Sequence, residues 1–196
     1  STVTEAWMGR FMLDFGGCAV LHRFCGPEVQ AKMIKDAFDR QLTGNRPGLL
    51  GCSLGVDENL DRYSKSYEAG CRLFCIDVAH AHQQKVRDFF ERVYIQHRDT
   101  HFIIGNVATP GAINYLTNTF HSVDWDRVSF KVGIGGGSVC TTRVVTGCGI
   151  PTLQSVLDIR RAGIKHNLIA DGGIKNSGDI MKALAAGANS VMIGRL

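Results

Sequence analysis

The 196 residues are enough for one domain with a sizeable core, and 44% hydrophobic with 20% charged residues is the composition of a globular chain rather than a disordered one. The formal net charge of +4 comes from scattered Lys and Arg, so we expect small anionic ligands and no nucleic-acid partner. No apolar run approaches the ~18 to 20 residues of a membrane span, and residues 1–5 do not resemble a signal peptide, so we expect no membrane partner.

Cysteine usage indicates the redox compartment. The chain has seven cysteines, an odd number, and no two of them form a CxxC pair. Several stand inside apolar runs, as Cys75 does in Leu-Phe-Cys-Ile. This pattern is typical of reduced thiols in a cytoplasmic protein and not of a disulfide framework.

Short apolar runs alternate with amphipathic stretches in the first half of the chain. We predict strands over residues 18–22, 48–55, 73–78 and 102–107. The helices expected between them cover residues 27–42, 59–69 and 83–97. Pro27 suits a helix start, because the N–H that proline lacks needs no partner there, and Gly70 is a typical residue at a helix end.

The second half continues the same alternation. A helix is expected to begin at Thr109-Pro110, with Thr109 as its N-cap. Further helices are expected over residues 151–162, ending before Gly163, and over residues 177–186. The remaining predicted strands cover residues 128–134, 167–170 and 190–193.

This alternation predicts a parallel α/β architecture with seven strands. Polar residues follow nearly every strand, which favours a (β/α)8 TIM barrel over a doubly wound sheet, where they would gather at one switch point. Seven strands are one fewer than a barrel needs, so we expect the first strand to be missing and the chain to belong to a longer protein. No linker divides it, and we predict one catalytic domain over residues 1–196, without an inserted regulatory domain.

The most informative stretch follows the fifth predicted strand, where four glycines stand within five positions. Glycine lets other groups approach the backbone, which phosphate binding and cation binding by carbonyls both require. Cys140 comes next, at a strand end where catalytic side chains usually lie. A lone cysteine is more often a small buried hydrophobe, but the hydroxyls and glycines around Cys140 favour a setting that stabilises a thiolate.

These residues resemble the family of inosine-5′-monophosphate (IMP) dehydrogenase and GMP reductase. The family loop is close to Gly-Ile-Gly-Pro-Gly-Ser-x-Cys-Thr-Thr-Arg, and residues 133–143 read Gly-Ile-Gly-Gly-Gly-Ser-Val-Cys-Thr-Thr-Arg. Similar segments occur in the family's order along nearly the whole chain, at residues 19–23, 76–82, 105–109, 170–174, 177–179 and 191–194.

The resemblance implies a role for each matching position. Cys140 would attack C2 of the purine, and Thr142 would help to position water or ammonia there. The substrate IMP, XMP or GMP would be bound by Ser138, Asn106, Asp171, Gly172, Gly173, Gly194 and Arg195. The cofactor, NAD or NADP, would be bound by Asp77, Val78, Ala79 and Gly133. A monovalent cation, K+, would be bound by the backbone carbonyls of Gly135, Gly137 and Cys140.

Elementary chemistry is compatible with these roles. C2 of a hypoxanthine ring is electrophilic enough for a thiolate to add to it. Asp171 suits two ribose hydroxyls as a charged acceptor, although an aspartate before Gly-Gly is also common in turns. The family also implies a homotetramer.

Two positions depart from the family pattern. Gly136 replaces the usual proline, which loosens the loop. Arg195 stands where serine or glycine is usual, so it would either strengthen phosphate binding or block the usual hydrogen bond. The catalytic flap that follows the eighth strand, with its Arg-Tyr pair, is absent from these residues.

We consider three hypotheses about the reaction and favour the first. The first is IMP dehydrogenase, which converts IMP, NAD+ and water into XMP and NADH; residues 67–70, 105–109, 172–178 and 183–187 resemble that branch more. The second is GMP reductase, which converts GMP and NADPH into IMP, ammonia and NADP+; residues 77–79 favour it. The third is a catalytically idle nucleotide-binding paralogue, suggested by Gly136 and Arg195.

Overall fold

The computed structural model describes residues 3–38, 48–57, 59–118, 120, 122–137 and 140–194. The chain forms two compact units, which we call unit 1 (Ser1–Asp77 with Phe89–Phe102) and unit 2 (Val78–Asp88 with Ile103–Leu196). That residues 1–196 form a single catalytic domain stays a prediction. Hydrogen-bonded strand neighbours follow the chain order from β1 to β7, without the reversal that marks a doubly wound sheet.

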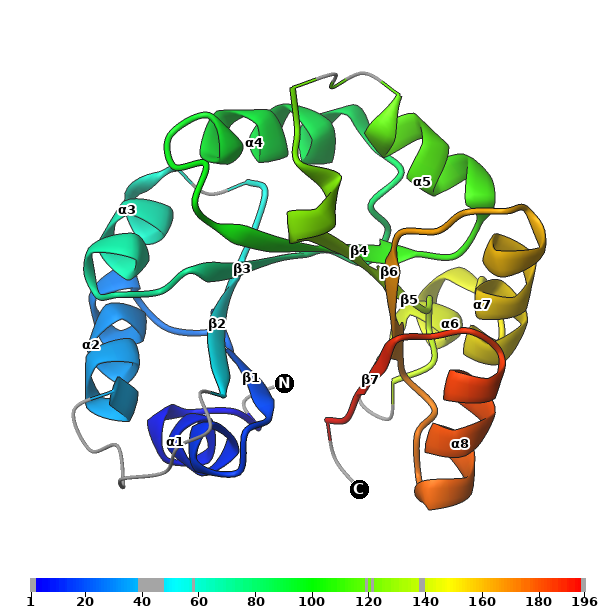
Figure 1. The fold of residues 1–196 in the computed structure, drawn as a ribbon, viewed down its shortest axis with the longest axis horizontal. Coiled ribbons are helices and arrows are strands. Elements are labelled where there is room, and N and C mark those ends of the chain that lie inside the picture. Colours follow the sequence, from blue (N-terminus) through cyan, green and yellow to red (C-terminus); the bar gives the residue numbers. More distant parts are fainter. Residues whose placement is uncertain are drawn as a thin grey trace. The chain divides into compact units, whose positions relative to one another are not determined.

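Unit 1 is built on three parallel strands. β1 (Cys18–Leu21) pairs with β2 (Leu49–Leu54), which pairs with β3 (Leu73–Asp77). The helices α2 (Pro27–Phe38) and α3 (Asp61–Glu68) lie side by side along these strands (Figure 1). Because the helices cover the strands, most of the strand residues are buried and read as apolar runs, although Cys18 and Leu49 at the strand starts are exposed.

An aromatic cluster forms the core of unit 1. Tyr63 of α3 lies 4.6 Å from the ring of Phe74 on β3, and Phe90 meets Phe102 edge to face at 5.2 Å. Phe90 and Phe102 come from α4 (Gln84–Tyr94) and from the start of β4 (His101–Val107). All four rings are almost fully buried, so this cluster contributes strongly to the stability of the unit.

Unit 2 repeats the pattern with β5 (Val128–Val132), β6 (Asn167–Asp171) and β7 (Ser190–Met192), which pair in parallel. The helices α7 (Thr152–Arg161) and α8 (Ser177–Ala185) lie side by side along them (Figure 1). In register, Val132 is opposite Ala170 and Asp171 is opposite Met192. The loops after these strands therefore leave from the same end, which positions the candidate site.

The helix after β4, α5 (Pro110–Thr117), begins as predicted. The Thr109 side chain accepts a hydrogen bond from the Ala112 N–H at 3.3 Å, so Thr109 is the N-cap. No helix among the described residues has the length and apolarity needed to cross a membrane.

Three short elements were not predicted, and several boundaries differ. The missed elements are α1 (Ala6–Asp14), a 3-10 turn at Trp125–Arg127 and α6 (Thr142–Thr146). β5 ends at Val132 instead of residue 134, because Gly133 leaves the strand with a φ of +144°. The helix predicted over residues 27–42 is seen to Phe38, and its last residues lie outside the described part.

Candidate active site

Three polar side chains meet where β4, β5 and β6 end in unit 2. Lys131 Nζ donates to Asp171 Oδ2 at 2.8 Å and also to Asn106 Oδ1. The Asn106 amide nitrogen donates to the same Asp171 Oδ2 at 2.8 Å and to the Gly133 carbonyl at 2.5 Å. The predicted residues Asn106, Asp171 and Gly133 are thus brought together around a lysine.

Lys131 is a candidate site residue that sequence reasoning missed. Its side chain is 5% exposed and that of Asp171 is 24% exposed. A buried ammonium is strongly unfavourable unless it is paired and hydrogen-bonded, and both conditions are met here. The signal was available in Val-Ser-Phe-Lys-Val, where a charged residue interrupts an apolar strand.

Residues 133–137, which we call the glycine loop, lie against the start of the β6–α8 loop. A Cβ at Gly133 would lie 2.0 Å from the Asp171 carbonyl oxygen, and one at Gly172 would lie 2.8 Å from Gly136 C and 2.9 Å from Gly137 N. Thr152 Oγ1, at the start of α7, donates to the same Asp171 carbonyl at 3.1 Å. The two loops can approach this closely because Gly172 on one side and Gly136 and Gly137 on the other have no side chains.

Cys140 lies just beyond this contact. Its N–H donates to the Gly137 carbonyl at 3.1 Å, and its Sγ is 3.2 Å from Thr142 Oγ1. The hydrogen bond between Cys140 Sγ and the Thr142 hydroxyl is the largest cause that lowers the pKa of the Cys140 thiol, with a smaller effect from the Arg143 charge. The thiol is half-exposed, so the structure places a partly accessible, thiolate-prone sulfur on this loop.

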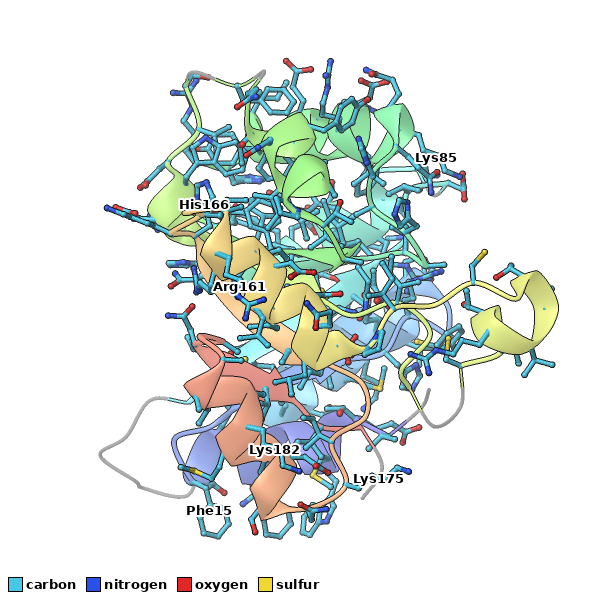
Figure 2. All side chains as sticks on the ribbon, turned by 90° about the vertical axis from the view of Figure 1, so that its right-hand side faces the viewer. Phe15, Lys85, Arg161, His166, Lys175 and Lys182 are labelled. Carbon is cyan, nitrogen blue, oxygen red and sulfur yellow. The ribbon has the colours of Figure 1, made fainter. Side chains whose placement is uncertain are left out.

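The loop after Cys140 returns through α6, which projects away from α7 and α8 (Figure 2, yellow). Val144 and Val145 on α6 are 86% and 77% exposed. Arg143 fastens the loop: its side chain covers Gly135 and Gly149, and its guanidinium donates to the Ile150 carbonyl at 3.3 Å. Ile134 and Ile150 form an antiparallel bridge at the base.

The predicted cofactor-binding positions of unit 2 flank β4. The Val78 N–H donates to the Gly105 carbonyl at 3.0 Å on one side, and the Gly133 N–H donates to the Val107 carbonyl at 2.9 Å on the other. Ala79 is exposed beside Val78. Asp77 ends β3 and belongs to unit 1.

The remaining predicted positions are placed as follows. Gly172 and Gly173 follow β6 with φ values of +91° and +80°, and Gly194 follows β7 at the same strand end, exposed. Ser138 and Arg195 lie outside the described residues. For a cation, the carbonyls of Gly135, Gly137 and Cys140 are of the ligand type that K+ takes.

Comparison with known proteins adds a family match. The family model described as "IMP dehydrogenase / GMP reductase domain" matches residues 1–196. Curated proteins named inosine-5′-monophosphate dehydrogenase are similar: the one from Aquifex aeolicus (strain VF5) is 39% identical over 150 residues, covering 75% of this chain and 29% of its own length. The one from Bacillus subtilis (strain 168) is 40% identical over 164 residues, covering 83% of this chain and 31% of its own length.

A solved structure is similar over nearly the whole chain. The crystal structure of inosine 5′-monophosphate dehydrogenase from Legionella pneumophila matches with a TM-score of 0.82 and 40% identity, covering 98% of this chain and 55% of that chain. This match and the strand order confirm the predicted α/β barrel class. The chain spans about a third of the length of the curated relatives given above.

Proposed function

Since the chain belongs to the IMP dehydrogenase / GMP reductase domain family, we propose that it is an NAD-dependent oxidoreductase that acts at C2 of a purine nucleotide through Cys140. The reaction is IMP, NAD+ and water to XMP, NADH and a proton. The observation that carries the proposal is the position of Cys140. Its thiol has a lowered pKa, and its backbone N–H donates to the Gly137 carbonyl of the glycine loop, which packs against Gly172.

Cys140 supplies the nucleophile. Its thiolate adds to C2 of the hypoxanthine ring, and the C2 hydrogen then leaves as hydride, so a C–S bond replaces a C–H bond. When bound, NAD supplies the acceptor for that hydride. Water next attacks C2, the C–S bond breaks with its electron pair on sulfur, and XMP leaves with release of a proton. Thr142, 3.2 Å from the sulfur, stabilises the departing thiolate and would orient the water.

The family resemblance supports the proposed nucleotide and cofactor sites. Asp171 would accept from the ribose hydroxyls, and the backbone N–H groups of Gly172 and Gly173 would hold the phosphate. Ser138, Gly194 and Arg195 would complete the phosphate site, and Asp77, Val78, Ala79 and Gly133 would hold NAD. K+ bound by the carbonyls of Gly135, Gly137 and Cys140 would fix the glycine loop. We also expect a homotetramer and a cytoplasmic protein, consistent with seven free cysteines.

GMP reduction is the second candidate, because the matching family model covers both reactions. A paired absorbance assay on the full-length protein in potassium buffer separates them. We expect absorbance at the NADH band to rise with IMP and NAD+, and not to fall with GMP and NADPH. A fall in absorbance with GMP and NADPH, without a rise with IMP and NAD+, would assign the reductase. No change in either, with nucleotide binding intact, would indicate an idle paralogue and overturn the enzymatic proposal.

A further inference from the structure

The hydrogen bonds around Asp171 divide its two carboxylate oxygens between different tasks. Oδ2 receives both donors of the network, from Lys131 Nζ and from Asn106 Nδ2, each at 2.8 Å. Within the described part of the chain, no hydrogen bond to Oδ1 is formed. The Asp171 side chain as a whole is 24% exposed. With Oδ2 taken by two donors, Oδ1 is the oxygen left for a ligand to approach.

Lys131 also fixes which way the Asn106 amide points. Its ammonium donates to Asn106 Oδ1, which leaves the amide nitrogen facing the Gly133 carbonyl and Asp171 Oδ2. A flipped amide would place its nitrogen against an ammonium and its oxygen against a carbonyl and a carboxylate. Both amide N–H groups are therefore used within the protein, and Asn106 can offer a ligand only a lone pair.

We propose that Lys131 is a positioning residue for the nucleotide ribose: by occupying Oδ2 of Asp171 and orienting Asn106, it presents Oδ1 to the ribose hydroxyls. The inference rests on the proposed function, because it takes the ligand to be a ribonucleotide. Lys131 is 5% exposed and is itself placed too deep to meet a ligand, so it acts through Asp171. Without its positive charge, Asp171 would be free to turn and would retain only the Asn106 amide as a partner.

The test separates a ribose role from a general structural one. Affinities for IMP and for its 2′,3′-dideoxy analogue are measured by isothermal titration calorimetry on the full chain and on Lys131→Met, which keeps most of the side-chain volume. Charged hydrogen bonds contribute ~1.5 to 3 kcal/mol, so we expect IMP binding to weaken about 10- to 100-fold. Binding of the dideoxy analogue, which lacks the hydroxyls, should weaken only slightly.

Two controls make the result specific. Lys182→Met removes the same charge from a side chain that is 67% exposed on α8 (Figure 2), and it should leave both affinities unchanged. Asp171→Asn should weaken IMP binding by itself, and adding Lys131→Met to it should then have little further effect. If Lys131→Met does not fold, judged by circular dichroism, Lys131→Gln is measured in its place with the same expectations.

Each outcome is decisive. Equal losses for IMP and the dideoxy analogue, or no loss for IMP, would overturn the role of Lys131 while leaving the proposed function in place. Full additivity of Lys131→Met and Asp171→Asn would overturn action through Asp171. Failure of the unmodified protein to bind IMP at all would overturn the proposed function, and this inference with it.

Discussion

The Thr142 hydroxyl is the largest of several influences that lower the pKa of the Cys140 thiol. The Thr142 side chain, 3.2 Å from the sulfur, stabilises the thiolate and lowers the pKa of the thiol. A lowered pKa means that the thiolate is populated at lower pH than in an ordinary cysteine. Reactions that require the thiolate should therefore begin at lower pH than for an ordinary cysteine. When the Thr142 hydroxyl is removed, the pH at which they begin should rise.

We predict that Thr142→Val shifts the pH profile of Cys140 alkylation by iodoacetamide to higher pH and slows alkylation severalfold at neutral pH. Peptide mass spectrometry would follow Cys140 separately from the other thiols. Thr141→Val is the matched control, because Thr141 occupies the N-cap position of α6 but its side chain makes no capping hydrogen bond. Equal profiles for Thr142→Val and the unmodified protein would contradict the assignment of Thr142.

Removing the nucleophile should separate catalysis from binding. We predict that Cys140→Ala abolishes turnover and leaves the affinity for IMP nearly unchanged, because Asp171, Gly172 and Gly173 are untouched. Absorbance of NADH and calorimetry measure the two quantities. Substantial turnover by Cys140→Ala would exclude Cys140 as the nucleophile.

At the scale of the element, the contact between the glycine loop and the β6–α8 loop depends on missing side chains. Gly172 and Gly173 both have positive φ, but only Gly172 faces backbone at under 3 Å, while a Cβ at Gly173 would meet nothing within 4 Å. The adjacent glycines thus share a conformational requirement and differ in packing.

This difference predicts unequal effects of the same substitution. Gly173→Ala should lower the free energy of unfolding by about 1–2 kcal/mol, from the left-handed backbone alone. Gly172→Ala should lower it clearly further, because the new methyl forces the glycine loop away. Urea denaturation followed by circular dichroism compares the two, and equal losses would show that the two loops are not in contact.

Sequence reasoning was strongest where a pattern is local and weakest where it is spatial. The alternation of seven strands with helices and the Thr109 cap were predicted, because alternation and capping are read from neighbouring residues. Lys131 was missed because its partners, Asn106 and Asp171, are 25 and 40 residues away in the chain. α6 was missed because five residues are too few to show a repeating helical pattern of apolar positions.

The whole molecule is a member of an enzyme family whose activity this chain is proposed to share. Family membership was predicted from the 133–143 loop and is confirmed by a match over residues 1–196. The site residues assigned by resemblance, among them Ser138 and Arg195, stay predictions. Stability at this scale depends on the cores of the units, including the aromatic cluster of unit 1.

Within that cluster, Phe90→Ala should destabilise the protein by about 3–5 kcal/mol, because Phe90 is 1% exposed and meets Phe102. Phe11→Ala on α1 makes the same chemical change at a ring that is 42% exposed, and it should cost less than about 1 kcal/mol. Thermal denaturation measures both. Similar losses for the two variants would contradict the placement of the core.

The most direct test of the account is to trap the bond between Cys140 and the purine. The full-length protein would be quenched with acid during turnover of IMP and NAD+, digested, and analysed by mass spectrometry. We predict that the peptide containing Cys140 carries the added mass of the purine nucleotide, and that the adduct is absent without NAD+ and in Cys140→Ala. Turnover without an adduct on Cys140, or an adduct on a different cysteine, would contradict the account.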